Sequence, residues 1–304
     1  MDTGEIIGWP RSRWELSAAE TYALLYGPKT SKPSQPFKLA VLELVSRRVL
    51  ALIEIEKSGF LGTRKIAVLS RGEGGTDNRV LLAVRDLFFS CGKTVFPDGV
   101  VGVEVKSLAE QAGKRYGQEK GFAEAVVMKS LEEQGFYTRE RRSFLGLIPY
   151  HRWTLTRAGE AAKAQLTVTM RLGESQFGRW VDREPNRALQ YLGLVGPAIL
   201  LMEPLHPELK RLREVQDRID TSGDSGGSST SWDDDSSWDD TQDSGGFDLG
   251  DFDFGGFDLD DLDFDFDVLD GLDDVFDAID SGVDAGGGDG GDGGGDGGGN
   301  GGGD

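Results

Sequence analysis

The sequence predicts an α+β protein, mainly α, that ends in a disordered acidic tail. Three observations lead to this fold class. The same order, helices followed by a β-hairpin, occurs in residues 1–72 and again in residues 79–170. Apolar residues at helical spacing continue through residues 171–220, which predicts a helical appendix. Residues 221–304 hold 26 aspartates and no lysine, arginine or glutamate, a composition typical of disorder.

The first unit, residues 1–72, opens with a capping box. Ser17 and Glu20 can satisfy each other's backbone amides at the start of a short helix, which a Gly-Pro pair ends. Pro36 lies at the start of a second helix with an apolar face. Two β-type runs on either side of a turn-like Lys-Ser-Gly-Phe-Leu-Gly-Thr then predict a hairpin. The glycine-rich residues 72–78 are interpreted as a linker.

The second unit, residues 79–170, repeats the order. Helices are predicted at residues 80–90, 104–117 and 121–135, followed by strands at 136–144 and 150–156. Ala123, Val127 and Leu131 share one face of the third helix, and Gly135 is expected to end it. Thr156 is a candidate N-cap for a closing helix over residues 155–166.

Residues 16–166 resemble a tandem pair of winged-helix domains, and Leu-Thr-Arg-Ala-Gly after the second hairpin is similar to the closing helix of that superfamily. The short first helix with its Gly-Pro end and the Gly/Asp-rich C-terminus resemble a group of uncharacterised bacterial proteins with glycine-rich tails. Those relatives usually carry membrane spans after the second unit. Here the longest uncharged run is residues 188–202, shorter than the about 20 residues a span needs, and it predicts a buried helix broken near Pro197. The resemblance carries over no functional residue.

In the appendix, apolar residues form a stripe along one helix. Because only about two heptads are present, packing against the preceding units is favoured over a coiled-coil dimer. The stripe consists of Leu205, Leu209, Leu212, Val215 and Ile219.

The motifs argue against an enzyme and against a cofactor or metal site. Gly-Asp-Ser-Gly-Gly at 223–227 matches the letters around a serine-protease nucleophile, but no apolar residues surround it to fix a geometry. Gly-Lys-Thr at 92–94 lacks the first glycine of a phosphate-binding loop, because Leu87 occupies that position. Cys91 is the single cysteine, and the first residues lack a signal-peptide pattern, so a cytoplasmic location is expected.

Charge divides the chain into two parts of opposite sign. Residues 1–220 carry 33 basic and 27 acidic side chains, a net charge of +6, whereas residues 221–304 carry −26. We therefore expect a non-enzymatic binding or adaptor protein. In one hypothesis the tail covers the basic head and external ligands compete with it. In the other, head and tail bind different proteins and do not touch.

The second hairpin is the candidate contact surface of the head, with basic strands around an apolar tip. A protein partner is favoured, and anionic lipid or nucleic acid are alternatives, with Tyr137, Tyr150 and Trp153 nearby for stacking. The glutamates of the predicted helix 121–135 argue against sequence-specific DNA binding. The interpretation favoured over any partner is that the tip packs against residues 171–220 and the arginines form a solvated face. The candidate residues are Arg139, Arg141, Arg142, Phe144, Leu145, Leu147, Ile148, His151 and Arg152.

The tail mixes aspartate with apolar residues, first in β-type alternation and then, from Leu269 onward, at helical spacing. Such segments suit partners that offer an apolar groove rimmed by basic residues, although a solubility tail without a partner fits the same composition. The candidate interaction residues are Phe247, Phe252, Phe254, Phe257, Phe264, Phe266, Leu269, Leu272, Phe276 and Ile279.

Overall fold

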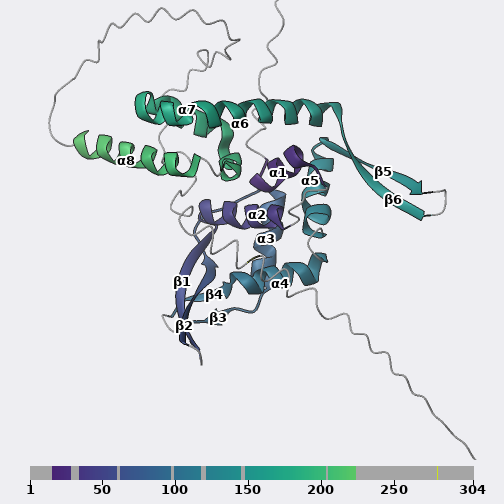
Figure 1. The fold of residues 1–304 in the computed structure, drawn as a ribbon. Helices are drawn as coiled ribbons and strands as arrows, with labels where there is room; N and C mark the ends of the chain where they lie inside the picture. Colours follow the sequence, from purple (N-terminus) through teal and green to yellow (C-terminus); the bar gives the residue numbers. More distant parts are fainter. Residues whose placement is uncertain are drawn as a thin grey trace, which may run out of the picture.

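The computed structural model describes residues 16–28, 34–59, 62–96, 99–117, 121–144, 148–202, 205–223 and Ile279. Within them helices predominate, and the strands form two small antiparallel sheets, which confirms the mainly helical α+β prediction (Figure 1). From residue 224 onward, the predictions for the tail lie outside the described residues, except at Ile279. None of the described helices combines the length and the apolar character that crossing a bilayer requires.

Helix α2 (Gln35–Ser46) lies at the centre of the core and contacts both α1 (Ala18–Tyr26) and α3 (Arg79–Ser90). Every side chain of α2 from Pro36 onward is buried, as expected for a helix covered on all sides. The predicted capping box at the start of α1 is confirmed. The Ser17 hydroxyl accepts from the Glu20 amide at 3.2 Å, and the Glu20 carboxylate accepts from the Ser17 amide at 2.7 Å.

The first sheet has the strand order β1-β2-β4-β3. Strands β1 (Leu50–Gly59) and β2 (Gly62–Arg71) form the predicted first hairpin. Strands β3 (Thr94–Val95) and β4 (Val101–Glu104) were not predicted, because two and four residues are too short to show a β period.

The pairing of β4 with β2 brings residues of both predicted units into one sheet. Gly102 permits this approach, because a Cβ there would lie 2.5 Å from the Leu69 carbonyl oxygen. The main hydrophobic cluster also draws on both units, for example Leu50 from β1 and Leu108 from α4 (Val105–Tyr116), the helix after β4. The division at residues 72–79 stays a prediction, but the two segments share a sheet and a core.

The three helices predicted after residue 79 are present, and the structure adds a cap at Asn78. Asn78 caps α3 by accepting from the amides of Val80 and Leu81 at 2.9 and 3.2 Å. Helix α4 (Val105–Tyr116) follows β4. The third predicted helix consists of a π-helical turn, η2 (Ala123–Val127), continued by α5 (Met128–Glu133). Its predicted face is buried, and Gly135 ends it with φ +80°.

Helix α6 (Arg157–Arg183) begins at the predicted cap, where the Thr156 hydroxyl accepts from the Gly159 amide at 3.0 Å. It runs for 27 residues, well past the predicted end near Leu166, and continues across the predicted boundary at 170–171. Gly173 allows α6 to pack closely against the following helix, α7, because a Cβ at this position would lie 2.0 Å from the hydroxyl of Tyr191 in α7.

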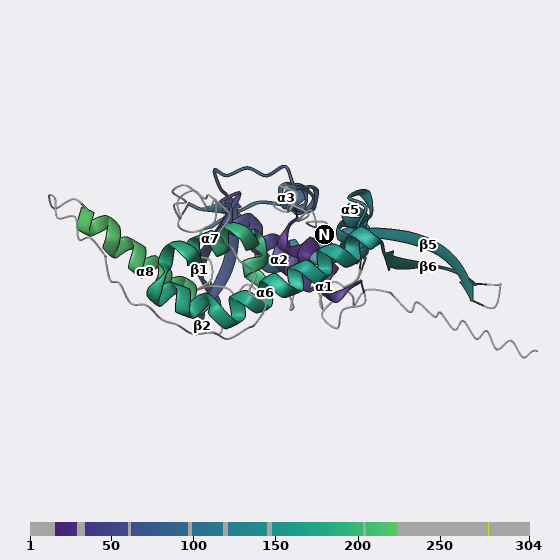
Figure 2. The ribbon, with the colours of Figure 1, turned by 90° about the horizontal axis from the view of Figure 1, so that it is seen from above.

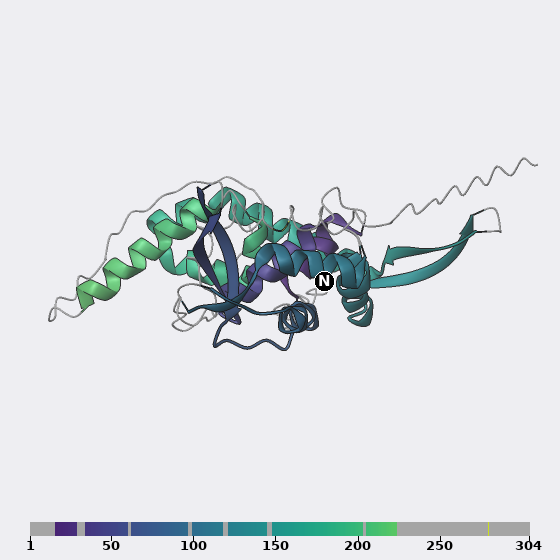
Figure 3. The same cartoon turned by 90° about the horizontal axis from the view of Figure 1, so that it is seen from below.

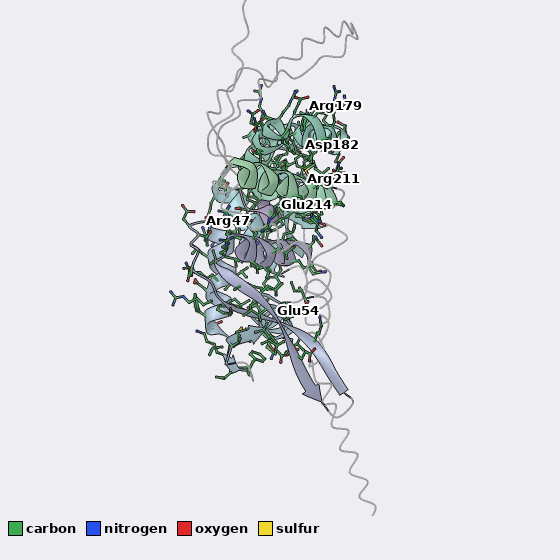
Figure 4. The ribbon with its side chains drawn as sticks, turned by 90° about the vertical axis from the view of Figure 1, so that its left-hand side faces the viewer. Arg47, Glu54, Arg179, Asp182, Arg211 and Glu214 are labelled. Carbon is green, nitrogen blue, oxygen red and sulfur yellow. The ribbon has the colours of Figure 1, made fainter. Side chains whose placement is uncertain are left out.

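The predicted break near Pro197 is confirmed. Helix α7 (Pro185–Val195) gives way to a 3₁₀ helix, η3 (Gly196–Leu201). Helix α8 (His206–Gly223) packs on α6 and α7 through the buried residues Leu209 and Leu212, which belong to the main hydrophobic cluster. Arg211 of α8 forms ion pairs with Asp182 of α6 and, at 2.6 Å, with Glu208 on its own helix (Figure 4).

Candidate functional site

The second hairpin projects from the helical body between α5 and α6. It consists of β5 (Tyr137–Phe144) and β6 (Ile148–Leu155), paired in register from Tyr137↔Leu155 to Phe144↔Ile148. Its far end points away from the helices in three views (Figures 1, 2 and 3). The two predicted strands are therefore confirmed, and the structure adds their register.

The register assigns each side chain to one of two faces, since directly opposed residues of an antiparallel pair point to the same side. Arg139 opposes Trp153, and Arg141 opposes His151, so these four residues share one face. We call them the basic face. Both arginines and the histidine are exposed, and the Arg139 guanidinium lies 5.6 Å from the centre of the half-buried Trp153 ring. No acidic residue occurs among the described positions of this face.

The opposite face carries the hairpin's carboxylate. Glu140 accepts two hydrogen bonds from Arg142, at 2.8 and 3.1 Å, and opposes Arg152 in the register. The five basic residues of the predicted contact surface therefore divide between the two faces. Arg139, Arg141 and His151 are together on the basic face, while Arg142 and Arg152 lie on the face that contains an acidic partner.

The apolar tip stays a prediction. Phe144 and Ile148 close the strand ladder, but their side chains and residues 145–147 lie outside what the structure describes. One interpretation is wrong: Tyr137 cannot stack on a ligand, because its side chain is buried in the main cluster. Its hydroxyl donates to the Ala23 carbonyl of α1 at 3.3 Å, and burial raises the pKa of the phenol.

The base of the hairpin is held by backbone and hydroxyl contacts. The Thr156 amide donates to the Phe136 carbonyl at 3.0 Å, and the Thr156 hydroxyl donates to the Gly135 carbonyl at 2.7 Å. Gly159 permits this fit, because a Cβ there would lie 2.2 Å from the Phe136 carbonyl oxygen. The start of β5, the end of β6 and the first turn of α6 are thus fixed together.

A buried carboxylate secures the helix that leads into the hairpin. Glu20 of α1 is fully buried and accepts from Ser130 of α5 at 2.6 Å and from Gln134, the C-cap of α5, at 2.8 Å. Its other oxygen accepts from the Ser17 amide and hydroxyl and from Asn78 at 2.9 Å. Five donors satisfy this carboxylate, as a buried charge requires. The sequence identified Glu20 only as a cap residue, and the partners more than 100 positions away were not predicted.

A second fully buried carboxylate lies on α2. Glu43 accepts from the Ala18 amide at 2.7 Å and pairs with the partly exposed Arg47 at 3.0 Å. Burial raises the pKa of Glu43 from 4.5 to about 7, although the Arg47 charge and the Ala18 amide act in the opposite direction and Glu20 adds to the rise. The start of α1 therefore rests on two buried carboxylates, one of which titrates near neutral pH.

Among the residues that the structure describes, no three histidine, cysteine, aspartate or glutamate side chains are grouped so as to hold a metal ion. Comparison with known proteins gave no match to any family model, any curated protein or any solved structure.

Proposed function

We propose that the chain is a non-enzymatic binding or adaptor protein that holds an acidic segment of a partner protein on the basic face of the β5–β6 hairpin. One observation supports this most directly. Arg139, Arg141 and His151 are exposed on the same face of a projecting hairpin, and no carboxylate shares that face among its described positions.

The chemistry of the face suggests the kind of ligand. Two arginines on one strand present planar guanidinium groups, which bind carboxylates through paired charge-assisted hydrogen bonds. Trp153 beside Arg139 offers an apolar surface at the base of the same face. A segment that alternates carboxylates with aromatic or aliphatic side chains would satisfy both features.

Net charge favours a short acidic protein segment over a polyanionic surface. The whole chain carries −20, and this charge opposes approach to nucleic acid or to an anionic membrane at long range. A short peptide meets less of that repulsion and can be bound locally. Nucleic acid and lipid are therefore alternative ligands, and the experiment below tests each of them.

The fold assignment that accompanies this proposal is the winged-helix one. Helices followed by a hairpin occur in both halves of the body, which supports this assignment, and β5–β6 would then be the second wing. We propose that the protein acts in the cytoplasm, in keeping with its lone cysteine, Cys91.

The test compares charge reversal on the two faces of one hairpin. Arg141→Glu changes the basic face, and Arg152→Glu makes the same change on the other face, where the residue is also exposed. Binding of a short fluorescein-labelled peptide of alternating Asp and Phe to the full chain is measured by anisotropy. We expect Arg141→Glu to weaken binding roughly tenfold or more, since charge-assisted hydrogen bonds are lost, and Arg152→Glu to weaken it only about twofold.

Equal losses in the two variants would contradict the proposal, because net charge alone would then explain binding. The same two variants are also titrated with a single-stranded oligonucleotide and with vesicles containing phosphatidylserine. If either probe binds more tightly than the peptide and depends on Arg141, the partner class proposed is wrong.

A further inference from the structure

Ile279 of the tail packs in the core of the folded body, by which we mean the described residues between 16 and 223. Ile279 lies 56 residues beyond the end of α8 at Gly223, yet its side chain is fully buried and belongs to the main hydrophobic cluster. The backbone at Ile279 is helical. The cluster otherwise consists of residues of the body, including residues of α1, α2 and α7.

We infer that residues 269–283 are an intramolecular ligand of the body, and that Ile279 is the residue that anchors them. The segment contains five aspartates and no basic residue, so it cannot bury an isoleucine against itself. The body supplies the apolar surface, because the other members of the cluster to which Ile279 belongs are residues of the body. This inference does not depend on the basic face of the hairpin.

The sequence of the segment suits docking of one helical edge. Its apolar residues recur three or four positions apart, the spacing by which an amphipathic helix presents anchors to an apolar groove. The aspartates of the segment are opposite in sign to the net charge of +6 that residues 1–220 carry, so the charges of the two parts are complementary. The apolar residues of this edge are Leu269, Leu272, Phe276, Ile279 and Val283.

Because residues 269–283 belong to the same chain as the body, a weak contact is enough to keep them bound to it. The sequence between α8 and Ile279 has 55 residues, and an unstructured chain of that length has a root-mean-square span of roughly 40 Å, about the size of a domain. Such a tether gives an effective concentration near the millimolar range. A segment that would bind poorly as a free peptide therefore stays bound most of the time, and a partner with higher affinity can still displace it.

The test is hydrogen exchange of the full chain, followed by mass spectrometry of peptic peptides that cover residues 269–283. Ile279→Asp removes the anchor, and Ala278→Asp adds the same charge one position away, off the apolar edge. We expect exchange of the segment to be slowed in the unmodified chain and in Ala278→Asp. In Ile279→Asp we expect exchange to be roughly tenfold faster or more, since burial of the isoleucine is lost.

Three results would overturn the inference. The segment could exchange as fast as an unstructured peptide in the unmodified chain, or the two variants could behave alike. Protection that rises with protein concentration would show that the segment binds a second copy of the chain. Exchange of α2 serves as the folding control, and its amides should stay protected in both variants because α2 is buried from Pro36 onward. Failure here would leave the peptide titrations of the hairpin variants unaffected.

Discussion

Replacing Glu43 with glutamine should make the stability of the protein less dependent on pH. In the folded chain this carboxyl is fully buried, and burial raises its pKa from 4.5 to about 7. The folded state therefore keeps a proton that the unfolded chain releases. Because the folded pKa is the higher one, the stabilisation is complete below about pH 4.5 and is lost as the pH rises towards 7.

The size of the effect follows from the two pKa values. A pKa difference between 4.5 and about 7 corresponds to about 3 kcal/mol in the free energy of unfolding. Between about pH 5 and about pH 8, a range that avoids the isoelectric point near 4.5, the expected loss is about 2.5 kcal/mol. Other groups titrate in this range too, so only a comparison between variants isolates Glu43.

The assay is urea unfolding of the full chain at several pH values, for the unmodified protein, Glu43→Gln and a control, Glu54→Gln. Glu54 lies on β1, is exposed and pairs with Lys65 at 2.9 Å, so it undergoes the same chemical change outside the core (Figure 4). The free energy of unfolding of the unmodified protein should fall by about 2.5 kcal/mol relative to Glu43→Gln as the pH rises. The difference in free energy of unfolding between the unmodified protein and Glu54→Gln should stay nearly constant over the same range.

Parallel curves for the unmodified protein and Glu43→Gln would refute this reasoning. They would mean that the Arg47 guanidinium, 3.0 Å from the carboxylate, offsets the desolvation and keeps Glu43 ionised. Since Arg47 is partly exposed, its attraction is screened by water, and we expect desolvation to dominate.

Three substitutions test the supports of the body and the hairpin, each by urea unfolding. Gly173→Ala should cost about 1–3 kcal/mol, because its Cβ meets the buried Tyr191 hydroxyl; an unchanged midpoint would show that α6 and α7 can separate freely. Ser130→Ala should cost about 1.5–3 kcal/mol, because the Glu20 carboxylate loses a 2.6 Å donor; a neutral result would mean that water replaces the hydroxyl. Thr156→Ala should cost about 1 kcal/mol through loss of the α6 cap, and an effect near zero would argue against that cap.

Local signals in the sequence predicted the beginnings and ends of elements well. The capping box at Ser17, the cap at Thr156, the glycine at 135 and the break near Pro197 each depend on neighbouring residues alone. The length of α6 was not predicted, because its continuation past Leu166 is stabilised by packing against α7 and α8 and not by local sequence.

Contacts between distant residues could not be predicted from the sequence. Strand β4 exists because β2 is already in place beside it, and four residues show no period of their own. The capping box indicated Glu20, but its hydrogen bonds to Ser130 and Gln134 depend on how α1 packs against α5. In the hairpin the alternation of a strand already separates Arg139 and Arg141 from Arg142. The face on which the other strand places His151 required the register Arg141↔His151.

The basic face and the docked tail segment would be coupled by charge but held by different forces. Contacts of aspartates with Arg139 and Arg141 weaken as salt screens them, whereas the buried side chain of Ile279 is held by an apolar contact that salt does not weaken. If Ile279 stays on the body, the chain between residues 224 and 278 is a loop tethered at both ends, and its aspartates remain at a high local concentration. An acidic partner must then compete with that loop at low salt, and release of Ile279 would favour the partner without any change in the hairpin itself.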